Sequence, residues 1–378
     1  MAKENPETIF MTGGTGLIGK WTLTWLTKNY RVLVLARNAR QRQQDLAHWL
    51  DQRGGNSRNL TLLDGDLGKH RLGLSPEDWQ HACSANYIYH MGAAFDWGLT
   101  PEFAHRITVA GSEQLLALAS EMVGLRQFVH LTGFMLAAPH VWETLGLDPQ
   151  NREVNGELSR KQIKRLYRRF SPYEAAKFEA HFFVSHRAKT LGIPLTNIEL
   201  SSVVGHSETG ELGQPHGLEL LIEALWKKRL PAIPGSGDHW LPVISVDYLA
   251  QFISAVIEYP ESLGQSYVVL DKESPNLGEM IQLISDQLQQ PAPRLRLPKW
   301  LVTMGMRLGG ERLVQIPAET LQLIQPYRYD THNTLALAKK MGLEMPDSEN
   351  TLKKTVLRWM DQHVASGESS TSPPISYS

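Results

Sequence analysis

Cysteine is almost absent from this sequence, and so are long apolar runs and any excess of charge of one sign. The single cysteine, Cys83, excludes an intramolecular disulfide and gives no starting point for a metal site. No uninterrupted apolar stretch approaches the roughly 20 residues of a membrane span, and the polar N-terminus does not resemble a secretory signal peptide. The net charge of −1 gives no general attraction to nucleic acid or anionic membranes. These features predict a cytoplasmic protein without a metal, a membrane span or a nucleic-acid partner.

Short apolar runs alternate with helix-length segments over most of the chain. This alternation predicts an α/β fold of the Rossmann type, in which helices cover both faces of a doubly wound parallel sheet. The predicted strands lie at residues 8–12, 31–36, 60–63, 87–91, 127–131, 195–200 and 267–270.

A glycine-rich segment follows the first predicted strand and reads Thr12-Gly13-Gly14-Thr15-Gly16-Leu17-Ile18-Gly19. Glycines between a strand and a helix allow a tight turn whose backbone N–H groups can approach a pyrophosphate. A phosphate-binding loop of a nucleoside triphosphatase is excluded because Trp21 stands where a hydroxyl would hold magnesium. We therefore predict a dinucleotide site at Gly13, Thr15, Gly16, Leu17, Ile18 and Gly19.

The end of the second predicted strand indicates which dinucleotide binds. A carboxylate about 20 residues beyond the glycines would hold the adenosine ribose of NAD, and none is present there. Arg37 stands at this place instead, with Arg40 and Arg42 nearby. We expect Arg37 to pair with the 2′-phosphate of NADP; the alternative is a solvated arginine at a helix start.

Tyr173 and Lys177 lie one helical turn apart, so both side chains face the same side of a predicted helix. Ser171 is a good N-cap and Pro172 a good first helical residue, which places Tyr173 in the first turn. We expect the Lys177 ammonium to lower the phenol pKa from its usual value near 10, so that Tyr173 can deliver a proton near neutral pH.

A chain of 378 residues exceeds the usual ceiling for a single core, so we expect one large domain with a smaller lobe, or two domains that share a cleft. We expect a dinucleotide-binding domain at residues 1–205 with a return segment at about 241–274. A substrate-binding lobe would comprise residues 206–240 and 275–365, and residues 366–378 would form a disordered tail.

Several segments, taken in order, resemble the extended short-chain dehydrogenase/reductase superfamily, in particular its thioester-reductase and fatty acyl-CoA reductase branch. The resemblance covers residues from about 8 to about 360. Besides the glycine-rich segment and the Tyr173–Lys177 pair, it rests on Asp64-Gly65-Asp66-Leu67, His90-Met91-Gly92-Ala93-Ala94, Phe128-Val129-His130-Leu131-Thr132 and Val203-Val204-Gly205-His206-Ser207-Glu208-Thr209-Gly210.

The resemblance implies roles for individual residues. Tyr173 would donate the proton, and Lys177 would bind the nicotinamide ribose and tune the tyrosine. Asp66 and Leu67 would contact the adenine, and Ala93 would lie in the cofactor site.

The sequence departs from the family pattern at three places. A serine or threonine after the fifth strand usually binds the substrate oxygen, but the aligned residue is Gly133. Thr132, one residue earlier, is either a second catalytic donor or a strand-end threonine that bonds the backbone. Thr108 stands where an asparagine usually supports the lysine, and Glu199-Leu200 stands where Arg-Pro is common.

Aromatic residues after two predicted strand ends could line an apolar substrate pocket, namely Phe95, Trp97 and Phe134. Ordinary core packing is the alternative for each of them.

A cluster of positive charge precedes Tyr173 and consists of Arg160, Lys161, Lys164, Arg165, Arg168 and Arg169. It is either a solvated helix face or a dock for an acidic acyl carrier protein or coenzyme A phosphates.

We expect an NADPH-dependent oxidoreductase that reduces a carbonyl or thioester, either an acyl-CoA or a carrier-bound acyl group. One alternative is a sugar-nucleotide epimerase or dehydratase that retains NAD. A second is a cofactor-binding protein that has lost turnover, which Gly133 and Thr108 would explain.

Overall fold

The computed structural model describes residues 6–213 and 217–364, and it divides into two compact units. Unit 1 comprises the chain up to Leu200 together with Leu249–Val269 and Thr331–Leu343. Unit 2 comprises Ser201–Tyr248, Leu270–Asp330 and the chain from Glu344 onward. The tail predicted at residues 366–378 lies outside the described residues.

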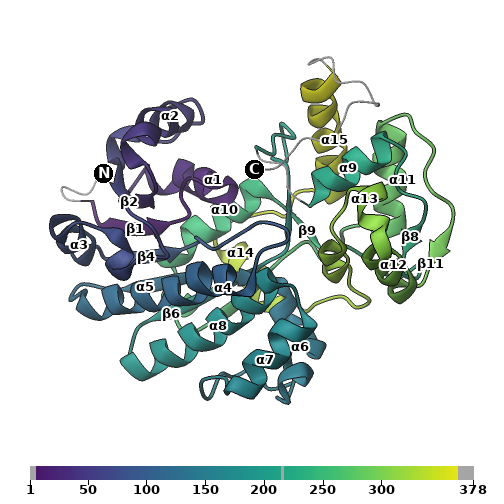
Figure 1. The fold of residues 1–378 in the computed structure, drawn as a ribbon. Helices are drawn as coiled ribbons and strands as arrows, with labels where there is room; N and C mark the ends of the chain where they lie inside the picture. Colours follow the sequence, from purple (N-terminus) through teal and green to yellow (C-terminus); the bar gives the residue numbers. More distant parts are fainter. Residues whose placement is uncertain (1–5, 214–216, 365–378) are drawn as a thin grey trace. The chain divides into compact units, whose positions relative to one another are not determined.

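A seven-stranded parallel sheet forms the centre of unit 1 (Figure 1). Its order is β10-β6-β5-β4-β1-β2-β3, so the winding direction changes between β1 and β4. All seven predicted apolar runs become strands of this sheet, which confirms the predicted doubly wound fold. The strands are β1 (Thr8–Thr12), β2 (Arg31–Ala36), β3 (Leu60–Asp64), β4 (Tyr87–His90), β5 (Gln127–Gly133), β6 (Leu195–Leu200) and β10 (Ser266–Val269).

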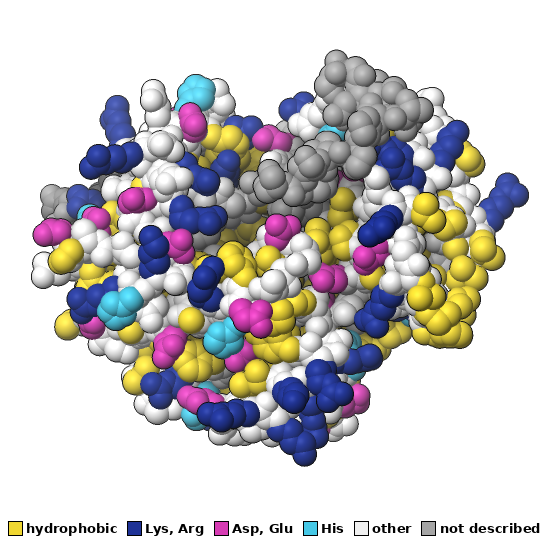
Figure 2. All heavy atoms as spheres, viewed as in Figure 1, with side chains coloured by type: hydrophobic (Ala, Val, Ile, Leu, Met, Phe, Trp, Pro, Cys, Tyr) yellow, Lys and Arg dark blue, Asp and Glu magenta, His cyan; other side chains and the backbone are white. Residues whose placement is uncertain are grey.

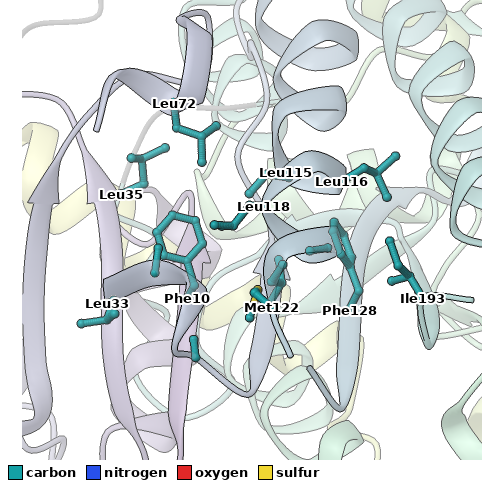
Figure 3. Packing of buried hydrophobic residues seen from close by; sticks show 14 of the residues in the cluster. Phe10, Leu33, Leu35, Leu72, Leu115, Leu116, Leu118, Met122, Phe128 and Ile193 are labelled. Atoms are coloured by element: carbon teal, nitrogen blue, oxygen red, sulfur yellow. The ribbon is translucent and has the colours of Figure 1, made fainter. Parts of the chain in front are cut away.

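Helices cover both faces of the sheet. On one face, Phe10 and Phe128 of the sheet join a buried cluster with Leu115 of α5, part of which Figure 3 shows. On the other face, the Tyr89 hydroxyl donates to the Ile253 carbonyl of α10 at 3.1 Å. The helices of unit 1 are α1 (Leu17–Leu26), α2 (Ala39–Asp51), α3 (Pro76–Cys83), α4 (Pro101–Ala104), α5 (Ala110–Glu121), α6 (Pro139–Leu145), α7 (Arg160–Arg169), α8 (Pro172–Leu191), α14 (His332–Lys340) and part of α10 (Val246–Ala255).

Unit 2 has its own hydrophobic core, built from α9, α11 and α15 around two short parallel strand pairs. Its strands are β7 (Ser202–Val204), β8 (Ile233–Pro234), β9 (Val243–Ser245) and β11 (Arg296–Leu297). Its helices are α9 (Leu218–Trp226), α11 (Leu277–Gln287), α12 (Lys299–Gly305), α13 (Glu311–Val314) and α15 (Ser348–Val364). In the part of the chain that the structure describes, no helix has the length and apolar character needed to cross a membrane.

The boundaries of the two units differ from the expected ones. Residues 241–248 and 270–274 were expected in the first domain, but they belong to unit 2, where β9 pairs with β7. Residues 331–343 were expected in the substrate lobe, but α14 belongs to unit 1. The Thr334 hydroxyl of α14 donates to the Val268 carbonyl of β10 at 2.9 Å, which ties this helix to the sheet edge.

Candidate active site

The glycine-rich turn lies after β1, beside the point where the sheet changes its winding direction. Gly13 adopts a left-handed φ of +76°, and its carbonyl accepts the Gly16 N–H at 3.0 Å. A Cβ atom at Gly19 would lie 2.1 Å from the Gly13 oxygen, and one at Gly13 would lie 2.7 Å from the Gly92 nitrogen. Both positions therefore require glycine. Helix α1 begins directly after Gly16, so its first N–H groups lie at the edge where open α/β sheets bind ligands.

A buried hydrogen-bond chain joins this turn to the loop after β4 and to α5. His90 Nδ1 lies 3.0 Å from Thr12 Oγ1, and His90 Nε2 lies 2.8 Å from Ser112 Oγ. Ser112 Oγ donates to the Thr108 carbonyl at 2.6 Å, so it must accept from His90 Nε2–H. His90 Nδ1 therefore accepts from the Thr12 hydroxyl, which itself accepts the Gly92 N–H at 3.1 Å.

This chain was not predicted from the sequence. His90 was noted only as part of a matching segment, because its partners Thr12 and Ser112 are ordinary polar residues at distant positions. Burial and the positive charge of Lys177 lower the pKa of His90 to about 3, so the ring is neutral and its two nitrogens keep distinct roles.

The residues predicted for the adenosine end lie near the ends of β2 and β3. Arg37 follows β2 directly and is exposed. Asp66 Oδ1 accepts the Gly68 N–H at 2.8 Å, and Leu67 lies so close to Gly92 that a Cβ there would be 2.7 Å from its Cδ1. Ala93 is half-buried in the loop after β4. These residues thus lie at the carboxyl edge of the sheet, as a dinucleotide site in this fold requires.

Tyr173 and Lys177 lie in the first turns of α8, as predicted. Ser171 caps the helix in a capping box with Glu174, and Pro172 is the first helical residue. Lys177 Nζ donates to the Leu131 carbonyl of β5 at 2.8 Å. Burial lowers the pKa of Lys177 from 10.5 to about 8. The lysine is therefore held against the sheet by a backbone contact that the sequence did not indicate.

The expected tuning of the tyrosine is wrong in direction. Burial raises the pKa of the Tyr173 phenol above its ordinary value, and the Glu174 carboxylate raises it further. The loss of solvation of a phenolate in this half-buried place is the larger of the two causes, and both raise the pKa. Tyr173 is consequently protonated at neutral pH.

Thr132 does not present its hydroxyl as a free donor. The side chain is 2% exposed, and its Oγ1 donates to the Ile198 carbonyl of β6 at 3.4 Å. This contact favours the second of the two alternatives, a strand-end threonine that bonds the backbone, over a second catalytic donor. Gly133 has an extended backbone, and a Cβ added there would meet no atom within 4 Å.

Two of the three predicted substrate residues lie together with Tyr173. The Phe95 ring packs edge-on against Tyr173 with 5.0 Å between centroids, and Trp97 lies 6.0 Å from Phe95. Phe95 is 44% exposed, so an apolar surface beside the tyrosine faces solvent. Phe134 is 3% exposed in a short helical turn after β5 and is a core residue.

Two further ionisable side chains, His130 and Glu199, are buried on neighbouring strands, and their burial was not predicted. His130 stacks on His90 with 5.2 Å between ring centroids, and burial lowers its pKa well below the usual value. Glu199, fully buried on β6, accepts two hydrogen bonds from Arg152 at 2.6 and 2.5 Å. Burial raises the pKa of Glu199, while Arg152 partly offsets this. Glu199, which stands where the family usually has an arginine, thus forms an ion pair with Arg152.

The predicted basic cluster forms helix α7. All six cationic side chains of this ten-residue helix are exposed, while Leu166 is buried. Figure 2 shows Lys and Arg side chains gathered where Figure 1 places α6 and α7. The cations are spaced so that like charges repeat at i and i+4, an arrangement that destabilises a helix by about 0.2–0.5 kcal/mol per pair.

The sequence of the chain matches a known family. The sequence profile of an NAD-binding family described as "Male sterility protein" matches residues 11–253, about two-thirds of the chain. The chain belongs to this family. Its members are nicotinamide-dependent reductases, so membership indicates an oxidoreductase and confirms the resemblance to the thioester-reductase and fatty acyl-CoA reductase branch.

Curated relatives include much longer proteins. The chain is 24% identical to the non-canonical nonribosomal peptide synthetase FrzA of Cladobotryum sp, over 93% of the chain and 36% of the relative. It is 27% identical to fatty acyl-CoA reductase 2 of Homo sapiens, over 33% of the chain and 28% of the relative. The chain thus spans about a third or less of the length of these relatives.

Solved structures support the fold. The terminal R domain of the myxalamid PKS-NRPS pathway has a TM-score of 0.74 at 21% identity, covering 97% of this chain and 92% of that one. A thiolation-reductase di-domain of an archaeal nonribosomal peptide synthetase has a TM-score of 0.71 at 13% identity, covering 96% and 76%.

Proposed function

We propose that the protein is an NADPH-dependent reductase that converts a thioester or another carbonyl substrate by hydride transfer, with Tyr173 as proton donor. The observation that supports this most directly is the position of Tyr173 and Lys177 on α8. Lys177 is held to the β5 backbone at 2.8 Å, and the exposed Phe95 ring packs against the tyrosine. An apolar surface beside a proton donor suits an acyl substrate.

The glycine turn fits a dinucleotide because a side chain at Gly13 or Gly19 would clash with the backbone that the turn brings close. The N–H groups at the start of α1 would hold the pyrophosphate, Asp66 and Leu67 the adenine, and Lys177 the nicotinamide ribose. The bound dinucleotide supplies a hydride to the carbonyl carbon.

Tyr173 would donate its proton to the substrate oxygen. Its raised pKa keeps the phenol protonated at neutral pH, so the proton is available when negative charge develops on that oxygen. For a thioester, one hydride and one proton give an aldehyde and release the thiol. Lys177, beside the tyrosine on α8, would orient the ribose and supply positive charge.

The reduction and the tyrosine's part in it are tested by NADPH oxidation with acyl-CoA, carrier-bound acyl and ketone substrates. Tyr173→Phe should lower kcat/KM by about 10²–10⁴-fold while NADPH still binds. Turnover unchanged by this substitution would contradict the mechanism. A tightly copurifying nicotinamide with no net oxidation would favour the epimerase or dehydratase, and NADPH binding without turnover on any substrate would favour a protein that has lost catalysis.

The preference for NADP is proposed from Arg37, which is exposed at the end of β2 where the 2′-phosphate would lie. Dissociation constants of the wild type and Arg37→Ala should show a loss of NADPH affinity with little change for NADH. Exposed Arg58, substituted in the same way, is the control. Equal NADPH affinities in the wild type and in Arg37→Ala would contradict the proposed role of Arg37 in the preference for NADP.

We propose an acidic acyl carrier protein as the partner of α7. Six exposed cations and no carboxylate on one short helix favour an acidic surface. Arg165→Glu with Arg168→Glu should raise KM for a carrier-bound substrate and leave KM for the free acyl-CoA unchanged. Charge reversal of exposed Arg58 and Arg187 is the control. A rise in both KM values would instead indicate a site for coenzyme A phosphates.

A further inference from the structure

Unit 2 exposes a group of large apolar side chains that its core does not use. Over α12, α13 and β11, Figure 2 shows hydrophobic side chains gathered on the surface. The exposed fractions are 56% for Leu295, 68% for Trp300, 48% for Met304, 81% for Leu308 and 77% for Leu313. We call these five residues the apolar patch. Contiguous exposed apolar surface on a folded domain usually marks an interaction site.

The spacing of the patch shows that its exposure is built into the helix. Trp300, Met304 and Leu308 follow one another at intervals of four residues, so they share one face of the helical segment from Lys299 to Gly310. Met306, which lies between them in sequence, is buried in the core of unit 2. The helix therefore has two apolar faces, and only one of them packs against the protein.

Positive charge surrounds the apolar patch. Residues 291–314 contain five cations and one carboxylate, in a chain whose net charge is −1. The cations are Arg294, Arg296, Lys299, Arg307 and Arg312. The carboxylate, Glu311, accepts the Ala318 N–H, so it is engaged within unit 2. Lys299 Nζ donates to the Ile324 carbonyl at 2.8 Å, whereas the four arginines are exposed. We call these four arginines, which alternate in sequence with the residues of the apolar patch, its basic rim.

A cavity of about 330 Å³ lies between residues 296–299 of this segment and residues 235–239. Arg296 and Lys299 line it together with Ser236 and His239. These cavity-lining cations lie between Leu295 and Trp300 in sequence, so a negatively charged group could occupy the cavity while apolar material covers the patch. The surface of an acidic phospholipid membrane offers both, because its acyl chains are apolar and its headgroups carry negative charge.

We propose that residues 294–313 bind the protein to the surface of an anionic phospholipid membrane. Trp300, Leu308 and Leu313 would enter the interface, and the arginines would contact the headgroup phosphates. A second copy of the chain fits less well, because a self-complementary contact would bring two basic rims together. This inference concerns a different surface from the reductase site and does not depend on the proposed function.

Sedimentation with vesicles tests this proposal. The full chain should bind vesicles that contain about one-third phosphatidylglycerol more tightly than vesicles of phosphatidylcholine alone, and added salt should weaken the binding. Arg307→Gln with Arg312→Gln should weaken binding by about 25-fold, since each arginine near an anionic surface is worth about fivefold. Leu308→Ser with Leu313→Ser should abolish it. Val123→Ser with Leu191→Ser, two exposed apolar positions of unit 1, is the control.

Thermal unfolding curves of the variants should match the wild type, because the substituted side chains are exposed. Three outcomes would overturn the proposal: equal affinity for both kinds of vesicle, equal losses in the unit 1 control, or dimerisation of the full chain that the Leu308 and Leu313 substitutions abolish. Loss of binding to an acidic carrier protein in the same variants, without vesicle binding by the wild type, would assign the patch to a protein partner instead.

Discussion

Buried neutral histidines should make the protein unstable in weak acid. His90, His130 and His181 are 2%, 2% and 3% exposed, and all belong to unit 1. Burial lowers the pKa of His90 and of His181 to about 3, with further contributions from the charges of Lys177 and Arg152 respectively. The pKa of His130 is also lowered well below 6.5, first by burial.

The sign of the effect follows from proton uptake. Below pH 6.5 the unfolded chain protonates each histidine, whereas the folded chain keeps His90 and His181 neutral until the pH approaches 3. The unfolded state therefore binds more protons, and the free energy of unfolding falls as the pH falls from 6.5 towards 3. At pH 5 His90 and His181 each cost about 2 kcal/mol relative to pH 8, or about 4 kcal/mol together, and the lowered pKa of His130 acts in the same direction. This is a large part of the roughly 5–15 kcal/mol that stabilises a typical fold.

Urea denaturation at pH 8 and pH 5 measures this cost directly. The substitution His181→Leu should reduce the difference between the two pH values by about 2 kcal/mol. It should change stability at pH 8 only slightly, because His181 Nδ1 has no hydrogen-bond partner among the described residues. The same substitution at His81, exposed on α3, is the control. A wild type equally stable at pH 5 and pH 8 would refute the reasoning.

Three further predictions concern the cofactor end and the substrate end of the site. Burial lowers the pKa of Lys177 to about 8, so its positive charge is lost as the pH rises past that value. The affinity for NADPH, measured from pH 7 to pH 10, should therefore fall in the wild type but not in Lys177→Met. Gly19→Ala places a methyl group 2.1 Å from the Gly13 oxygen, and thermal and urea unfolding should show a loss of about 2–4 kcal/mol that Gly156→Ala does not show. A Cβ atom added at Gly133 would meet no atom within 4 Å, so Gly133→Thr should leave the melting temperature unchanged, and the added hydroxyl should raise kcat/KM; a drop in melting temperature would show that the space is not open.

The sequence predicted the sheet and the ends of the key elements well because local signals specify them. Seven apolar runs became seven strands, and Ser171 with Pro172 marked the start of α8. The boundary between the units was less well predicted, since α14 belongs to unit 1 through a contact with β10 that lies 66 residues away in sequence. Contacts between residues so far apart in the chain leave no local pattern in the sequence.

The electrostatics of the site could not be predicted from spacing. A tyrosine and a lysine four positions apart share a helix face, but the sign of the phenol pKa shift depends on burial, which the fold determines. The same holds for Thr132, whose hydroxyl meets the Ile198 carbonyl only when β5 and β6 are paired. Motif spacing thus identified the residues, whereas their protonation and hydrogen bonding came from packing.

Thr108 illustrates how a departure from the family pattern can have a structural purpose. Its Oγ1 accepts the Ala94 N–H at 3.2 Å, and its carbonyl accepts Ser112 Oγ, the last link of the chain that starts at Thr12. Both contacts fix the loop that holds Phe95 against Tyr173. These contacts give Thr108 a structural role, so its presence is no argument for a protein that has lost turnover. That alternative function now depends on Gly133 alone. Because a Cβ atom at Gly133 would meet no atom within 4 Å, the activity of Gly133→Thr compared with that of the wild type separates an enzyme that works without a second donor from a protein that has lost catalysis.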